Sequence, residues 1–248
     1  MKTTERHHLK HNELADALGR AGDYYTHHRT TLTYVIVGVV LAAVSVGGFF
    51  AWRQNIDAKS RTLLAEAMVV SESRIQPPTP PPGGTAEAPG TPAQAPGTYP
   101  TEQAKLEAAL PKYLEAASAY PNSDAGRTAR YLAASTLVQL GRFDEAVTQY
   151  DQVIASGSGI VGNTARLGKA EAQVRAGKFD PAIAAFKELA DKKDGNLPTE
   201  ALLMELARAY RLAGKNEDAR KTLNQIVEQH ADSPVAAEAK QELEKLPS

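Results

Sequence analysis

The chain has 248 residues, of which 42% are hydrophobic and 23% charged, and these values are ordinary for a globular protein of one or two domains. A formal net charge of -1, with 19 basic and 21 acidic side chains from residue 101 onward, gives no general attraction to nucleic acid. The absence of cysteine from the sequence excludes disulfides, thiol catalysis and cysteine-ligated metal.

A stretch of 23 residues without a charge lies between Arg29 and Arg53. At about 1.5 Å per residue, a helix of this length crosses a hydrocarbon core of roughly 30 Å. Tyr34 and Trp52 stand at its two ends, where aromatic side chains meet the lipid headgroups. The sequence therefore predicts a transmembrane helix over 31–52. A cleaved signal peptide is the alternative, but its apolar core has only about 7 to 15 residues.

Basic residues set the expected orientation of this span. Five of them precede it and three follow it closely, so the positive-inside rule places the segment 1–30 in the cytoplasm. We expect a single-pass protein of the bacterial inner membrane, with a cytoplasmic N-terminus and its soluble part in the periplasm. Ala43 and Gly47 have the spacing of a small-residue helix contact, which leaves a homo-oligomer open.

Five of the six histidines fall in the N-terminal segment, and His7 and His11 are one helical turn apart. With Glu13 they would give only three candidate metal ligands, and no cysteine and no HExxH motif accompanies them. We therefore expect a solvated segment with no metal and no cofactor. Residues 12–25 carry apolar side chains at helical spacing, which predicts a short amphipathic helix there.

Two apolar helical stripes flank a tract rich in proline and glycine at 77–100. One lies in a membrane-proximal helix expected within 53–76, and the other runs from Leu106 to Tyr120, where Pro111 predicts a break or a bend. The tract predicts a disordered loop with no packed element. Because each stripe needs a partner, we favour an antiparallel helical pair joined by the tract. A free tether between the anchor and a separate domain is the alternative.

Three copies of one pattern follow at spacings of 36 and 37 residues, starting at Gly141, Gly177 and Gly214. Each copy has an alanine five residues after the glycine, a large apolar residue four further on and another three beyond, all on one stripe of a helix. Another alanine lies seven residues before each glycine, where a small side chain lets two helices approach closely. The pattern predicts helix–turn–helix units, and Asp180 and Ser233, each followed by proline, predict N-caps.

These residues resemble the tetratricopeptide repeat, whose pattern has a small residue in the first helix, then glycine, an aromatic, alanine and an aromatic. The matching residues are Gly141, Phe143, Ala146 and Tyr150 in the first copy and Gly177, Phe179, Ala182 and Phe186 in the second. The third copy departs from the pattern with Asn216 and Leu223. The resemblance covers about 125–230 and implies an all-α solenoid of helical hairpins. We expect this repeat domain to span 101–248 and to end in a capping helix.

The whole layout is similar to the ancillary SecYEG translocon subunit family, of the YfgM-like kind. This resemblance rests on the layout itself, the sequence FFAWRQ at 49–54 and the stretch 120–146. The resemblance implies an adaptor that links the Sec translocon to periplasmic chaperones or unfolded substrates. The stretch 120–146 is also similar to envelope repeat proteins of the outer-membrane assembly type, which leaves a cell-envelope scaffold open. A regulator acting through the cytoplasmic segment is a third hypothesis.

No enzymatic activity is expected, because the sequence has no phosphate-binding glycine loop, no GxSxG motif and no metal frame. A bound protein would meet the inner helices of the repeats at positions that do not pack between helices. Counted from each glycine, the candidate protein-binding residues are Tyr131, Gln139, Glu171, Arg175, Met204, Arg208 and Arg211. Each is equally compatible with an ordinary solvated face. The arginines of the later helices suit a carboxylate or an acidic peptide.

Overall fold

The computed structural model describes residues 13–77, 95–157, 159–192 and 197–247, with the backbone alone for 13–29 and Leu32. The chain divides into two compact units, Met1–Asn55 and Ile56–Ser248. The described residues form nine helices and two short strands.

The first unit holds most of α1, a helix that runs from Glu13 to Ser71 without a break. Every side chain described between residues 30 and 55 is exposed, including the large apolar Leu41 and Phe50. Among the described helices, only α1 is long and apolar enough to cross a membrane. The helix predicted over 31–52 is confirmed as part of this longer helix. The short helix predicted over 12–25 is also helical from Glu13 onward, but it is continuous with the rest of α1.

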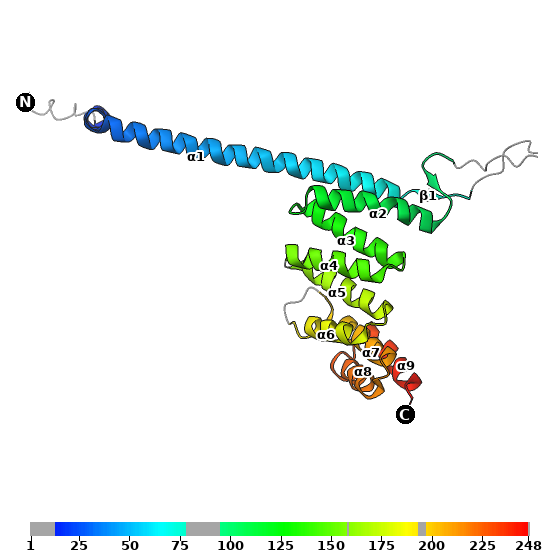
Figure 1. The fold of residues 1–248 in the computed structure, drawn as a ribbon. Coiled ribbons are helices and arrows are strands. Elements are labelled where there is room, and N and C mark those ends of the chain that lie inside the picture. The colour runs from blue at the N-terminus through cyan, green and yellow to red at the C-terminus, as the bar shows by residue number, and fades with distance from the viewer. Residues whose placement is uncertain (1–12, 78–94, 158, 193–196, 248) are drawn as a thin grey trace, which may run out of the picture. The chain divides into compact units, whose positions relative to one another are not determined.

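The second unit consists of helices that pack one after another in chain order (Figure 1). After the end of α1 these helices are α2 (Glu102–Ala119), α3 (Asp124–Gln139), α4 (Phe143–Ser156), α5 (Ile160–Arg175), α6 (Phe179–Ala190), α7 (Thr199–Leu212), α8 (Asn216–Gln229) and α9 (Pro234–Lys245). They form the hairpins α3–α4, α5–α6 and α7–α8, and α9 follows the last of them. The expected all-α solenoid of helical hairpins is therefore confirmed.

Alanine is the most frequent residue in the cores between these helices. One hydrophobic core extends from Ala67 of α1 through α2, α3 and α4 to α5, and a second extends from α5 to Leu246. The alanines predicted seven residues before the turn glycines, Ala134, Ala170 and Ala207, are all buried. Because these side chains are small, neighbouring helices pack closely at these positions, and larger side chains such as Phe186 and Leu223 fill the second core between them.

The three glycine turns share one backbone conformation, with φ of 74°, 73° and 73° at Gly141, Gly177 and Gly214. In the first turn, the backbone N–H of Arg142 donates to the carbonyl of Leu137 at 2.8 Å, and the N–H of Gly141 donates to Val138 at 3.1 Å. This pair of bonds is the Schellman motif, which satisfies the last carbonyls of the first helix. A side chain with a Cβ disfavours this positive φ, so the sequence places glycine there.

The side chains that follow the glycines connect one repeat to the next. Lys178 Nζ lies 2.6 Å from Asp144 Oδ1, and Lys215 Nζ lies 2.7 Å from Asp180 Oδ1. Asp180 was predicted as an N-cap, and this is wrong because α6 already begins at Phe179. The predicted N-cap at Ser233 is confirmed, since its hydroxyl accepts from the N–H of Val235 at 3.3 Å.

The last turns of α1 pack against α2. Ala67 lies in the same core as Leu110 and Tyr113, and the Tyr113 hydroxyl donates to Ser71 Oγ at 2.7 Å. α2 is one helix of 18 residues with Pro111 inside it, so of the two alternatives predicted there the break into two helices is wrong. Pro111 is exposed while its neighbours Leu110 and Tyr113 are buried, so the core face of the helix stays intact where the proline removes one N–H.

Two strands of two residues each follow α1 and precede α2. β1 (Arg74–Ile75) and β2 (Thr98–Tyr99) pair in parallel, and the N–H of Gln76 donates to the carbonyl of Tyr99 at 2.9 Å. β2 corrects the expectation that 77–100 contains no packed element. Its two residues are a β-branched and an aromatic residue, which favour strands. The prediction of a disordered loop otherwise falls on 78–94, which lie outside the described residues.

Candidate protein-binding site

The first helix of each repeat presents side chains at fixed distances from its turn glycine. Positions 10, 6 and 2 residues before the glycine lie on one face of a helix, because their spacing is about one helical turn. In α3 these positions hold Tyr131, Ser135 and Gln139, in α5 Leu167, Glu171 and Arg175, and in α7 Met204, Arg208 and Leu212. We refer to the side chains at these positions, with Arg211, as the inner face.

Four of the seven predicted residues meet at one hollow of the inner face, with a volume of about 190 Å³. This first hollow is lined by Tyr131, Ser135, Val138, Gln139, Tyr150, Leu167, Gly168, Glu171 and Arg175. The structure thus brings together Tyr131, Gln139, Glu171 and Arg175, as the repeat spacing predicts. Their role in binding stays a prediction.

Two tyrosine rings form part of this first hollow. Their centroids lie 5.6 Å apart with an angle of 64° between the planes of Tyr131 and Tyr150, which is an edge-to-face contact. Burial raises the pKa of both hydroxyls, and the nearby charge of Glu171 raises them further. Both tyrosines therefore stay neutral and can donate a hydrogen bond at any physiological pH.

Glu171 is half-buried beside these rings. Loss of hydration raises the pKa of its carboxyl group, and Glu205 of α7 raises it further, whereas Arg175 and Arg208 lower it. No hydrogen bond or ion pair joins the Glu171 side chain to another residue in the described part of the chain. The carboxylate is thus partly removed from water without a direct partner.

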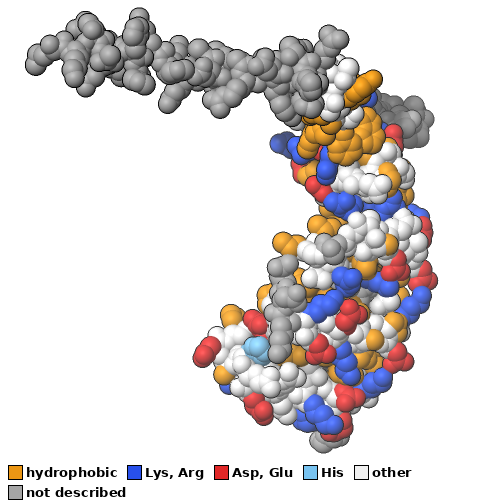
Figure 2. All heavy atoms as spheres, turned by 90° about the vertical axis from the view of Figure 1, so that its left-hand side faces the viewer, with side chains coloured by type: hydrophobic (Ala, Val, Ile, Leu, Met, Phe, Trp, Pro, Cys, Tyr) orange, Lys and Arg blue, Asp and Glu red, His pale blue; other side chains and the backbone are white. Residues whose placement is uncertain are grey.

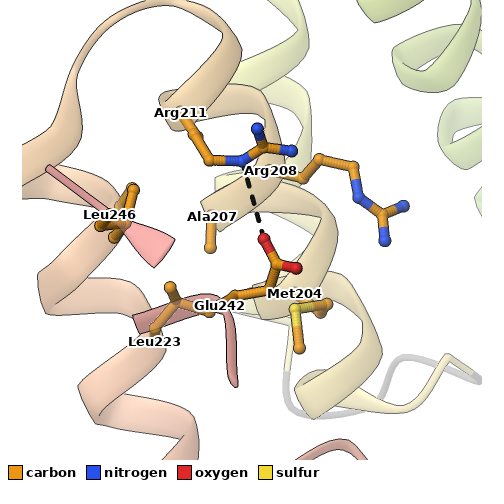
Figure 3. Close-up of a pocket in the computed structure, with 8 residues that line it drawn as sticks. Met204, Ala207, Arg208, Arg211, Leu223, Glu242 and Leu246 are labelled. Atoms are coloured by element: carbon orange, nitrogen blue, oxygen red, sulfur yellow. Dashed lines mark ion pairs between the residues drawn. The ribbon is translucent and has the colours of Figure 1, made fainter. Parts of the chain in front are cut away.

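The other three predicted residues, Met204, Arg208 and Arg211, line a second hollow together with Leu223, Glu242 and Leu246 (Figure 3). Its volume of about 10 Å³ admits no more than about one water molecule. Met204 is only 6% exposed and belongs to the core, so its prediction as a residue that does not pack between helices is wrong.

The arginines of the second hollow already have carboxylate neighbours. Arg208 contacts Glu205 at 2.7 Å and Glu238 of α9 at 3.6 Å. Arg211 Nε lies 3.8 Å from Glu242 Oε2, also of α9 (Figure 3). The expectation that these arginines suit an acidic peptide is weakened, because α9 supplies the negative charge itself. Figure 2 likewise shows acidic and basic side chains interspersed on one face of the second unit, without a large area of one sign.

Several residues of the first hollow were not among the predicted site residues. Tyr150 was assigned to the core by its repeat position, and it lines the first hollow as well. The repeat pattern does not single out Gly168, because the equivalent positions of the other two repeats hold Leu132 and Glu205 and not glycine. Only the packed structure shows that the absence of a side chain at Gly168 makes room for the Tyr150 ring.

A metal site is not formed by the described residues, which contain no group of three or more histidine, aspartate or glutamate side chains close enough to hold an ion. The pair His7 and His11 lies outside the described residues, and so does the side chain of Glu13.

The second unit is an α-solenoid of paired helices, the class of repeat scaffolds that offer an extended inner face to other molecules. Two models of the tetratricopeptide repeat match the chain, over residues 131–198 and 173–243. Residues 131–243 therefore carry tetratricopeptide repeats, and a long apolar N-terminal helix precedes them in the chain. Both models describe repeats and neither describes a catalytic domain.

Solved structures with the same arrangement include the nearly identical TPR-like repeats of a Podosopora anserina protein named as a kinesin light chain, and a point variant of the same repeats. Each is 19% identical and covers 56% of this chain and 76% of its own, with a TM-score of 0.50. At this identity the likeness shows the fold alone. None of the curated proteins matches the chain.

Proposed function

We propose that the protein is a membrane-anchored module that binds other proteins through the inner face of its tetratricopeptide repeats. The observation that carries this proposal is the first hollow, where aromatic, amide and charged side chains from three helices surround an open space. Such a mixture of rigid rings and polar groups is typical of sites that hold a protein segment. No catalytic group is needed for this role.

The long exposed apolar stretch of α1 supports the anchor. Large side chains such as Val44 and Trp52 are 67% and 60% exposed, and lipid would cover them. We assign residues 31–52 to the membrane, 1–30 to the cytoplasm and 53–248 to the periplasm, on the basis of the flanking basic residues. Within the periplasmic part, we assign 53–76 to a helix that packs onto the repeats, 77–100 to a loop and 101–248 to the repeat domain.

The layout supports a more specific role as an ancillary subunit at the Sec translocon. In this role the repeats would hold periplasmic chaperones or unfolded substrates close to the point where chains leave the membrane. A cell-envelope scaffold would use the same repeats as a platform for structural proteins. The two roles predict different partners for the same inner face.

Photo-crosslinking in intact membranes tests the proposal. Crosslinking residues are placed at Tyr131 and Gln139 on the inner face and, as matched controls, at Thr148 and Gln225, which are exposed on α4 and α8. We expect adducts from the inner face that are absent from the controls. Translocon subunits or chaperones among them support the adaptor, and envelope structural proteins support the scaffold. Equal adducts from both sets of positions contradict binding at the inner face.

A further inference from the structure

The first hollow contains a carboxylate that lacks a counter-ion in direct contact. Glu171 is half-buried on α5, and its side chain makes no hydrogen bond or ion pair within the described residues. Glu205, on the neighbouring α7, adds a second negative charge close enough to raise the pKa of Glu171. A cation that enters this space would be attracted more strongly than at an open surface, because the surroundings of Glu171 screen charge less than water does.

Aromatic rings stand beside the same carboxylate. Tyr131 and Tyr150 line the hollow with Glu171, and because Tyr150 is only 3% exposed, the partly exposed Tyr131 is the ring that a bound group can contact. The face of a tyrosine ring attracts ammonium and guanidinium groups. The hollow thus combines two features that each favour a positive charge.

Two cations already lie near this carboxylate, since the charges of both Arg175 and Arg208 lower its pKa, and Arg208 is paired with glutamates of α7 and α9. Arg175 follows Glu171 by one helical turn on α5, yet the two side chains form no direct ion pair. Arg175 is exposed, so its side chain is free to move away when another cation enters. It is therefore a competitor for the same carboxylate.

We propose that the first hollow receives a lysine or arginine side chain of the bound protein, with Glu171 as its counter-ion and with Tyr131 as the flanking ring. This inference rests on the proposed function, since it names the chemistry of the partner at the same site. It differs from the acidic peptide expected from the arginines of α7. Those arginines are paired with glutamates, whereas Glu171 has no such partner.

The test uses the full-length protein in detergent and a peptide as probe. The peptide is the partner segment that a crosslinking residue at Gln139 captures, and a second copy carries glutamine in place of its lysines and arginines. Glu171→Gln is expected to weaken binding of the basic peptide about tenfold, because it removes the charge and keeps the shape. Binding of the glutamine copy should not change between the two proteins.

Glu188→Gln is the matched control, since it removes an exposed carboxylate from α6 outside the first hollow. It should bind the basic peptide as the unmodified protein does. Arg175→Gln should tighten binding by a few fold, because the competing cation is lost. Circular dichroism confirms that each variant is folded.

Two results overturn the inference: equal affinity of Glu171→Gln and Glu188→Gln, or weaker binding by Arg175→Gln. Capture at position 139 of a segment without lysine or arginine overturns it as well. In all three cases the crosslinked partner still supports the proposed function. Failure of this inference is therefore distinguishable from failure of the proposed function. If nothing is captured at position 139, the proposed function and this inference fail together.

Discussion

The ring of Tyr150 lies directly against the backbone of Gly168. A Cβ added at Gly168 would be 2.6 Å from Cζ of that ring and 2.8 Å from its hydroxyl oxygen. Tyr150 belongs to the second helix of one repeat and Gly168 to the first helix of the next, so the contact joins two repeats. Because both residues line the first hollow, the same contact sets the shape of the candidate site.

Gly168→Ala is therefore expected to destabilise the second unit by about 1 to 3 kcal/mol, because the ring must shift within a packed core. Urea unfolding monitored by circular dichroism measures the change. Gly157→Ala is the matched control, since its Cβ would come no closer than 3.7 Å to a flexible Arg127 side chain. Equal loss of stability in both variants would show that the Tyr150 ring has room to move.

The sequence predicts the features of this fold that recur in every repeat. The turn glycines and the buried alanines at 36- and 37-residue spacing all lie where the pattern places them. The contact of Tyr150 with Gly168 could not be predicted, because it occurs in one repeat only. The pairing of Arg211 with Glu242 could not be predicted either, since it depends on how α9 packs against α7. Local periodicity thus determines the scaffold, and packing between non-equivalent residues determines the site.

Arg130 connects three helices and offers a second test of the packing. From α3 it donates to the carbonyl of Ala117 near the end of α2 at 3.1 Å, and to Gln149 and Gln152 of α4. A guanidinium group that satisfies a carbonyl in the last turn of a helix also interacts favourably with the helix dipole. Arg130→Ala should cost about 1 to 3 kcal/mol in the free energy of unfolding.

The control for Arg130 is Arg142→Ala, because Arg142 is exposed and pairs only with Glu145 within its own helix turn among the described contacts. This variant should unfold at nearly the same urea concentration as the unmodified protein. A loss as large as that of Arg130→Ala would contradict the connecting role of Arg130.

The contact between Tyr113 and Ser71 predicts how the protein responds to changes in the proline-rich tract. The end of α1, which precedes the tract, packs against α2, which follows it. Deletion of 78–94 with a short Gly/Ser bridge should therefore leave the melting temperature nearly unchanged. The deletion stops before β2 so that its pairing with β1 is kept. A large drop in melting temperature would contradict this expectation.

Proteolysis within the same tract distinguishes a loop from a tether. After cleavage at a protease site inserted in 78–94, we expect residues 95–248 to stay with the membrane fraction, because the packing of α1 on α2 holds them. Tyr113→Phe, which removes the hydroxyl that reaches Ser71, should raise the amount released. Complete release of the repeats from the unmodified protein would show that the tract is a tether.

The raised pKa of Glu171 predicts a dependence of stability on pH. Its folded-state pKa lies above the ordinary value of 4.5, mainly because burial disfavours the ionised form. The folded state then binds this proton more tightly than the unfolded state, so the contribution of Glu171 to stability is greatest below pH 4.5 and is lost as the pH rises through the raised pKa. As the pH rises from 4.5 through the raised pKa of Glu171, the stability of Glu171→Gln relative to the unmodified protein should therefore increase. At still higher pH this difference in stability should stay constant.

Glu242 provides the control of opposite sign. A hydrogen bond from Lys245 lowers its pKa below 4.5, so its contribution is present above that pH and is lost as the pH falls through the lowered pKa. Glu242→Gln should be less stable than the unmodified protein at neutral pH, and the difference should shrink in acid. Urea unfolding of the three proteins at closely spaced pH values measures both curves. If the Glu171→Gln curve instead follows that of Glu242→Gln, the pKa of Glu171 is lowered and not raised. The Glu171 carboxylate is then already paired with a positive side chain of the same protein before any partner binds.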